Sequence, residues 1–159
     1  MSLGKAFLLS YNEGMKIKQT RNTLSDTYLD AMKIRQSVFV QEQGVPRTME
    51  IDKNEAHCLY FVLYDDNGKA LATCRLLPDD ILSYVTLQRM AVLKEYRGKN
   101  LGITLLDQVL EFCRLQGFKK VILHAQLSAL NFYEKFQFSQ VGQTFEEAGI
   151  QHVTMEKTL

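Results

Sequence analysis

The chain has 159 residues, of which 46% are hydrophobic and 23% charged, and its formal net charge is +1. This length suits one domain that buries roughly two-thirds of its unfolded surface. The near-neutral charge excludes any global electrostatic reason to expect a nucleic acid or a membrane as partner, so basic character that matters must be local.

The N-terminal part carries no targeting or spanning signal. The apolar run in KAFLLSY (5–11) is too short for the central region of a signal peptide. No stretch approaches the roughly 18 apolar residues of a membrane-spanning helix. We expect residues 15–159 to form a single domain, preceded by a leader or a loose extension at 1–14, and the scattered cysteines indicate a cytoplasmic protein.

The first half of this domain predicts one helix among strands. Ser25 or Asp26 can cap a helix. This helix runs to about Gln43, where Gly44 and Pro46 stop it and a loop follows. The patterns predict strands at 15–20, 56–65, 69–78 and 84–93, with the Asn-Gly signal of a hairpin turn at 65–68.

The second half predicts a long helix followed by further strands. The helix, at 102–116, carries an apolar face and ends before Gly117. The patterns then predict a strand at 119–126, a short helix at 128–136 and closing strands at 137–145 and 149–157. An antiparallel hairpin followed by β-α-β and more strands indicates an α+β (mixed α/β) fold.

The stretch YRGKNLG (96–102) lies at the junction between a predicted strand and the long helix. Such a junction presents the first unpaired N–H groups of the helix and the positive end of its dipole. Glycine lets the backbone approach a ligand, and Arg97 and Lys99 add charge. These features favour a pyrophosphate site, although a plain turn and cap would use the same residues. The Walker loop and the GxGxxG fingerprint are both absent.

Two sequence motifs, one in this stretch and one about thirty residues later, extend this observation. Arg97 and Gly102 match the first and last positions of Q/R-x-x-G-x-G/A, with Asn100 in place of the first glycine. Asparagine tolerates the left-handed backbone better than other non-glycine residues. NFYEKFQF (131–138) is similar to a second motif in which Asn and Tyr precede a helix, with Gln137 in place of a glycine. Both motifs resemble those of the GNAT (GCN-five-related) N-acetyltransferase superfamily.

Three longer segments narrow the resemblance to the ElaA/YjcF-like branch: IRQSVFVQEQGVP (34–46), EAHCLYFVLYDDNGKALATCRLLP (55–78) and FEEAGIQHVTM (145–155). The resemblance implies the acyl-CoA N-acyltransferase fold, a central, mostly antiparallel twisted sheet flanked by helices. It also implies acetyl-CoA as co-substrate. Its acyl-pantetheine arm would lie between the strands at 84–92 and 119–126, paired with backbone groups like an extra strand. The implied cofactor-binding residues are Met90, Ala91, Val92, Arg97, Gly98, Lys99, Asn100, Leu101, Gly102, Ile103 and Asn131.

The reaction implied is direct attack of an amine on the acetyl carbon. Tyr133 matches the family position for an acid that assists the departing thiolate. His124 is the candidate base, because histidine titrates in the useful range; the alternative is a buried, hydrogen-bonded strand histidine. His57 and His152 match branch patterns and are either structural or substrate-facing. The three histidines lack ligand spacing, so we expect no catalytic metal.

Charged residues on the acceptor side have two interpretations. Acids could line a pocket for a cationic amine, or form a solvated face: Glu42, Glu50, Asp52, Glu55, Glu146 and Glu147. Arg35 and Arg75 could anchor an acidic group or close ion pairs. The acceptor is expected to be a small-molecule amine or a peptide.

Two other functions stay open on the sequence. One is an acyltransferase of the acyl-homoserine-lactone-synthase type, which would use S-adenosylmethionine. The other is a non-catalytic module that binds coenzyme A. Dimers are common in the family, so a homodimer is also an open expectation. The three scattered cysteines lie in apolar runs and are expected to be reduced and buried.

Overall fold

The computed structural model describes residues 14–159. The leader or extension predicted at 1–14 lies outside the described residues, apart from Gly14. The elements in chain order are β1 (Lys16–Thr20), α2 (Asp26–Arg35), the π-helix η1 (Gln36–Glu42), α3 (Arg47–Glu50), the 3-10 turn η2 (Glu55–His57), β2 (Leu59–Tyr64), β3 (Ala70–Pro78), β4 (Tyr84–Val92), the 3-10 turn η3 (Lys94–Tyr96), α4 (Leu101–Leu115), β5 (Lys120–Gln126), the 3-10 turn η4 (Leu127–Ala129), α5 (Leu130–Glu134), β6 (Ser139–Glu147) and β7 (Ile150–Thr158).

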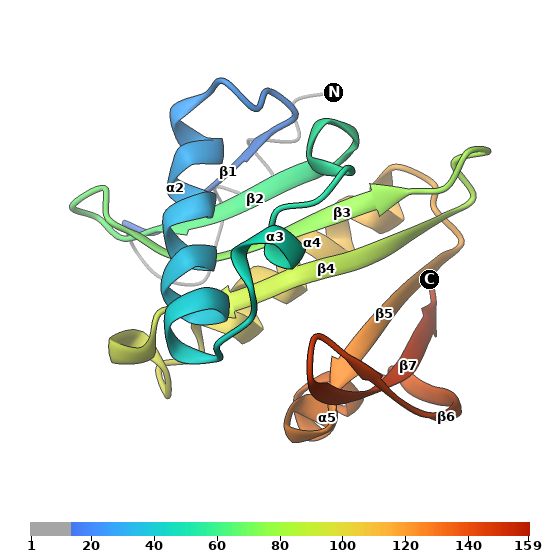
Figure 1. The fold of residues 1–159 in the computed structure, drawn as a ribbon. Coiled ribbons are helices and arrows are strands. Elements are labelled where there is room, and N and C mark those ends of the chain that lie inside the picture. The colour runs from blue at the N-terminus through green and yellow to red at the C-terminus, as the bar shows by residue number, and fades with distance from the viewer. Residues whose placement is uncertain (1–13) are drawn as a thin grey trace.

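Within residues 14–159 the strands form a seven-stranded sheet in the order β1-β2-β3-β4-β5-β7-β6. Neighbouring strands are antiparallel except β4 and β5, which are parallel. Figure 1 shows α2 in front of the sheet and α4 behind it, with β5, β6 and β7 turning away from β4. The predicted mixed fold, a mostly antiparallel sheet between helices, is confirmed.

Strand β2 shows why the sheet needs helices on both faces. All six of its residues are buried. Phe61 and Leu63 belong to the core that includes the inner face of α4, whereas Val62 and Tyr64 pack with Ala31 and other residues of the α2 layer. Because successive side chains of a strand point to opposite faces, a continuous apolar run fits only a strand covered on both sides.

The first helix begins as predicted but continues differently. Ser25 caps α2, because its hydroxyl accepts a hydrogen bond from the N–H of Tyr28 at 3.2 Å; such a cap stabilises a helix by about 1 kcal/mol. The predicted single helix to Gln43 instead widens into η1, where Gln43 N–H donates to Val38 O, five residues back. Gly44, at φ 74°, ends the segment as expected.

The segment predicted as a loop between this helix and β2 contains two short helical turns, α3 and η2. The three cysteines are buried and none forms a disulfide, as the sequence predicted. No helix within residues 14–159 is long and apolar enough to span a membrane.

Candidate active site

The site lies where β4 and β5 separate. Their parallel pairing covers Tyr84 to Leu87 on β4 and Lys120 to Leu123 on β5, and stops there. Beyond that point β5 continues to Gln126 paired only with β7. A cavity of about 730 Å³ lies at this opening. The two strands therefore separate where the resemblance implies the pantetheine arm, and this leaves an unpaired edge of β4 next to the cavity.

A bulge shapes that edge of β4. On β3, Thr73 pairs with Ala91 and Arg75 with Gln88, so two residues of β4, Arg89 and Met90, lie opposite one residue of β3. Arg89 has φ 56°, in the left-handed region that non-glycine residues rarely adopt. Bulges of this kind redirect side chains and end regular pairing. Here the bulge turns the next residues of β4 toward the cavity, which Gln88, Arg89, Met90, Ala91 and Val92 line.

The loop from β4 to α4 has the geometry of an anion cradle. Gly98 has φ 81° and Asn100 has φ 62° and ψ 21°, so both are left-handed. The left-handed asparagine anticipated from the sequence is thus present at the position before α4. The N–H groups of Leu101, Gly102 and Ile103 open α4 and have no carbonyl partner within the helix.

Arg97 holds this loop to the helical layer. Its Nη1 and Nη2 donate to the Glu42 carboxylate at 2.6 and 2.7 Å, and its Nε donates to Val92 O at 3.0 Å. The guanidinium is therefore neutralised by Glu42, and Val92 O already accepts one hydrogen bond. Lys99 lies with its Nζ 5.3 Å from the Tyr96 ring centroid.

The predicted cofactor-binding residues divide into two groups. Those that line the cavity are Met90, Ala91, Val92, Arg97 and Gly102. Gly98, Lys99 and Asn100 are exposed on the loop, Leu101 is buried under it, and Ile103 is 37% exposed. Asn131 is exposed on α5 and does not line the cavity. The structure thus brings the β4 edge and the start of α4 together.

Tyr133 reaches the cavity from α5. It is 7% exposed and packs edge-on against Phe132 and Phe138. Burial, with a smaller contribution from Cys74, raises the pKa of the Tyr133 phenol well above its ordinary value. The phenol therefore keeps its proton throughout the neutral range and can act as a hydrogen-bond donor to an anion that forms nearby.

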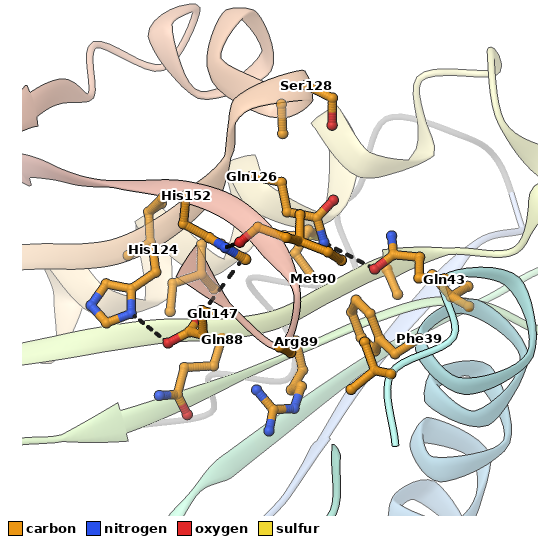
Figure 2. Close-up of a pocket in the computed structure, with 18 of the residues that line it drawn as sticks. Phe39, Gln43, Gln88, Arg89, Met90, His124, Gln126, Ser128, Glu147 and His152 are labelled. Carbon is orange, nitrogen blue, oxygen red and sulfur yellow. Dashed lines mark hydrogen bonds and ion pairs between the residues drawn. The ribbon is translucent and has the colours of Figure 1, made fainter. Parts of the chain in front are cut away.

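A carboxylate links two histidines on the opposite wall of the cavity. Glu147, at the end of β6, lies with Oε1 3.2 Å from His124 Nδ1 and Oε2 3.7 Å from His152 Nε2; Figure 2 shows Glu147 between the two rings. Phe145 packs edge-on against His124 and stacks on His152, with centroid distances of 5.1 and 5.9 Å. His124 is exposed, so the alternative of a buried strand histidine is wrong.

Backbone contacts fix the tautomer of one ring. His152 Nδ1 lies 2.7 Å from Ile150 O. Since a carbonyl oxygen only accepts hydrogen bonds, Nδ1 carries a proton, and Nε2 can pair with the Glu147 carboxylate only when it carries a proton too. The sequence singled out His124 and His152 separately, but it did not indicate that Glu147 joins them. That link depends on the β6–β7 hairpin and on the pairing of β7 with β5.

A buried ionic cluster lies beneath the β4 wall. It consists of Arg35, Glu50, Asp52, Glu55, Arg75 and Arg89. Arg35 contacts Glu50 at 2.8 Å and Glu55 at 2.9 Å. Of the two interpretations of Arg35 and Arg75, the ion pairs are the ones present. Glu50 and Asp52 do line the cavity, but they are paired with arginines.

Comparisons with known proteins agree with this geometry. A family model described as the acetyltransferase (GNAT) domain matches residues 22–159. The uncharacterized N-acetyltransferase YjcF of Bacillus subtilis is 34% identical over 129 residues, which cover 80% of this chain and 90% of YjcF. ElaA of Escherichia coli is 34% identical over 133 residues, which cover 79% of this chain and 84% of ElaA.

Solved structures give the same result. The crystal structure of Escherichia coli ElaA aligns with a TM-score of 0.79 and 29% identity, over 90% of this chain and 99% of ElaA. A proposed N-acetyltransferase from Lactobacillus plantarum aligns with a TM-score of 0.85 and 30% identity, over 92% of this chain and 99% of that one. The chain belongs to the GNAT acetyltransferase family and is an acyltransferase with the acyl-CoA N-acyltransferase fold. Its similarity to ElaA and YjcF is consistent with the branch that the sequence motifs indicated.

Proposed function

We propose that the protein transfers the acetyl group of acetyl-CoA to a primary amine of a small molecule or peptide in the cytoplasm, by direct attack in a ternary complex. The observation that carries this proposal is the single cavity shared by the unpaired edge of β4, Tyr133 and the His124–Glu147 pair. One cavity could thus hold the donor, a base (His124) and an acid (Tyr133).

The donor would bind along β4 and the loop before α4. The edge of β4 that β5 leaves unpaired beyond Leu87 suits an amide-rich arm that adds to the sheet like a strand. The left-handed loop and the free N–H groups of α4 suit a pyrophosphate, since a helix N-terminus favours anions. The cradle relies mainly on backbone N–H groups, because Arg97 is already paired with Glu42.

The acceptor must lose a proton before it attacks. A lysine-like amine with a pKa near 10.4 is neutral in only about one molecule in 2,500 at pH 7. His124 is the base in this proposal: its Nδ1 donates to Glu147, which orients the ring and leaves Nε2 to accept the amine proton. The free nitrogen then attacks the thioester carbon.

Tyr133 assists the leaving group. As the new C–N bond forms and the C–S bond breaks, negative charge moves to the sulfur. The Tyr133 phenol, protonated because burial raises its pKa, donates a hydrogen bond to that thiolate. Its high pKa favours hydrogen bonding over complete proton transfer, so the proton that finally reaches the sulfur comes from solvent.

The test combines binding and turnover. We expect acetyl-CoA to bind in calorimetric titration, and coenzyme A to be released when a panel of primary amines is added. Tyr133→Phe should lower kcat about 100-fold and leave the Kd for acetyl-CoA within threefold. Tyr84→Phe is the matched control, because Tyr84 is exposed on β4 and does not line the cavity.

Three other outcomes would contradict the proposal. Absence of acetyl-CoA binding would exclude an acetyltransferase. Binding without release of coenzyme A for any amine would favour a non-catalytic module. Turnover that requires S-adenosylmethionine would favour the lactone-synthase type.

A further inference from the structure

The side-chain amide nitrogen of Gln88, which lines the cavity, is a hydrogen-bond donor without an acceptor among the described residues. Its Oε1 accepts a hydrogen bond from Arg75 Nε at 3.0 Å. Because a guanidinium only donates, this contact fixes which end of the amide is oxygen. Arg75 is fully buried and is held in turn by Asp52 and Glu55 at 2.7 and 3.0 Å. The Gln88 amide nitrogen therefore points away from Arg75, with its orientation set by the buried cluster.

Arg89 presents a second donor beside the first. Its Nε donates to Glu50 Oε2 at 2.8 Å, and its Nη2 donates to Glu50 O at 3.0 Å and to Asp52 Oδ2 at 3.3 Å. Within residues 14–159, no acceptor contacts Arg89 Nη1 or Gln88 Nε2. No buried side-chain nitrogen or oxygen in that part of the chain lacks a partner, so both nitrogens are accessible. Both residues line the cavity (Figure 2).

The ionic cluster does not need Arg89 as its sole counter-charge. Glu50 is already paired with Arg35 at 2.8 Å, and Asp52 with Arg75 at 2.7 Å. Arg35 and Arg75 have side chains 1% exposed, whereas that of Arg89 is 24% exposed. Arg89 is thus the arginine of the cluster that lines the cavity, where it can share its charge with a further anion.

The backbone at this position supports a binding role. Arg89 lies at the β4 bulge in the left-handed conformation, which a non-glycine residue adopts only when surrounding contacts hold it there. The conformation places Gln88 and Arg89 on the same cavity, although consecutive residues of a regular strand point to opposite faces. Strained backbone of this kind concentrates at ligand sites.

We propose that Gln88 Nε2 and Arg89 Nη1 bind a carboxylate of the acceptor, so that the acceptor is an amino acid or a similar molecule with an amine and a carboxylate. This inference rests on the proposed function. A carboxylate has two oxygens that could accept from these two donors, and the guanidinium carries the opposite charge. Glu147 and His124 line the same cavity and would face the amine. The carboxylate of the acceptor would then contact Arg89, and its amine would lie near Glu147.

The test compares acceptors that differ only in the carboxylate. A panel of twenty L-amino acids, their amides and their decarboxylated amines is assayed for release of coenzyme A from acetyl-CoA. We expect at least one amino acid to be acetylated with kcat/KM tenfold or more above that of its amide and of its decarboxylated amine. Arg89→Met should raise KM for that amino acid at least tenfold and Gln88→Leu at least fivefold, in each case at least fivefold more than it raises KM for the amide.

A binding experiment makes the test independent of turnover. Ligand-observed NMR measures N-acetylglycine and N-acetylglycinamide binding to the protein saturated with coenzyme A. We expect the acid to bind at least tenfold more tightly, and the difference to disappear in Arg89→Met and Gln88→Leu. Arg47→Met is the control, since Arg47 is an exposed arginine on α3 that does not line the cavity.

The outcomes separate the two proposals. If amides or decarboxylated amines are acetylated as well as the acids, the carboxylate site is wrong and the acetyltransferase function stands. If no amine is acetylated, the proposed function is wrong, and the NMR comparison alone decides whether the carboxylate site exists. Equal binding of N-acetylglycine and its amide would overturn the site in either case.

Discussion

Glu55→Gln should strongly destabilise the protein, because Glu55 is the centre of the buried ionic cluster. The substitution keeps the size of the side chain and removes its charge. The Glu55 carboxylate, 12% exposed, accepts hydrogen bonds of 2.9–3.1 Å from Arg35 Nη1 and Nη2, Arg75 Nη1, Tyr28 Oη, Tyr60 Oη and the Asp52 N–H. In the variant, three arginines remain against two carboxylates in a region that water reaches poorly.

The expected magnitude follows from this geometry. Removing one partner of a buried ion pair costs about 3–5 kcal/mol, because the other charge stays buried and unpaired. At roughly 2–4 °C per kcal/mol for a chain of this size, the melting temperature should fall by about 6–20 °C. A loss of this size is a large fraction of the roughly 5–15 kcal/mol that stabilises a typical domain.

The same cluster predicts how stability depends on pH. Burial alone would raise the pKa of Glu55, but the hydrogen bonds from Arg35, Asp52 N–H and Tyr60 outweigh it and hold the pKa well below the ordinary 4.5. A carboxyl whose pKa is lowered by folding contributes its full stabilisation above the unfolded pKa and loses it as pH falls toward the folded value. The free energy of unfolding of the wild type should therefore decrease from about pH 5 downward, and this decrease should be smaller in Glu55→Gln.

Urea denaturation between pH 3 and pH 7, followed by circular dichroism, measures both effects. Glu42→Gln is the control, because Glu42 and Arg97 form a pair whose side chains are 31% and 40% exposed. Exposed pairs contribute less than about 1 kcal/mol. The reasoning would be refuted if Glu55→Gln lost less than about 1 kcal/mol, or if its pH dependence matched the wild type.

Further predictions concern the loop, the base and the thiols. Asn100→Val should lose about 1–2 kcal/mol in urea denaturation, because a β-branched residue is disfavoured at φ 62°, whereas Asn100→Gly should lose nothing. Glu147→Gln should lower kcat at least about tenfold, because the neutral amide lacks the charge that would stabilise the protonated ring of His124, the proposed base, with the Kd for acetyl-CoA unchanged in calorimetry. Burial raises the pKa of Cys58, Cys74 and Cys113, the last to about 12; a disulfide reagent at pH 8 should therefore titrate none of them in the native protein and all three in denaturant.

Local pattern was enough to predict most elements of the fold. The predicted helix at 102–116 matches α4 within one residue at each end, because its apolar spacing and Gly117 are local signals. The hairpin of β2 and β3 follows from the Asn-Gly turn at 65–68. Each of these signals lies within a few residues of the structure that it specifies, so periodicity and turn chemistry suffice.

No local sequence signal predicted the change from the α-helix α2 to the π-helix η1. The residues of Gln36–Glu42 suit an ordinary helix, and the wider turn is present only in the folded protein. The ionic cluster had the same limitation for a different reason. Arg35 and Glu50 are 15 residues apart in the chain, and Arg89 and Glu50 are 39 apart. The partners of these buried charges are far apart in the chain, so a local sequence pattern cannot identify them.

Sequence motifs predicted residues that line the cavity, but not the contacts between them. Motifs predicted positions for Tyr133 and Gly102, and the titration range of histidine suggested His124; all three line the cavity. They did not predict that Glu147 contacts His124 and His152, because that contact requires the register of two strand pairs at once. They also suggested Arg97 as a free phosphate ligand, although Glu42 holds it.

The ionic cluster is better explained by the site than by stability. Well-packed apolar residues of similar volume often replace a buried ion pair at no cost in stability, because burial of the charges offsets their attraction. Apolar residues could not replace two particular contacts. Arg75 fixes the orientation of the Gln88 amide, and the bonds from Arg89 to Glu50 hold a left-handed residue in the middle of β4. Both contacts determine which polar atoms face the cavity, so the cluster shapes the wall at which we propose that the acceptor binds.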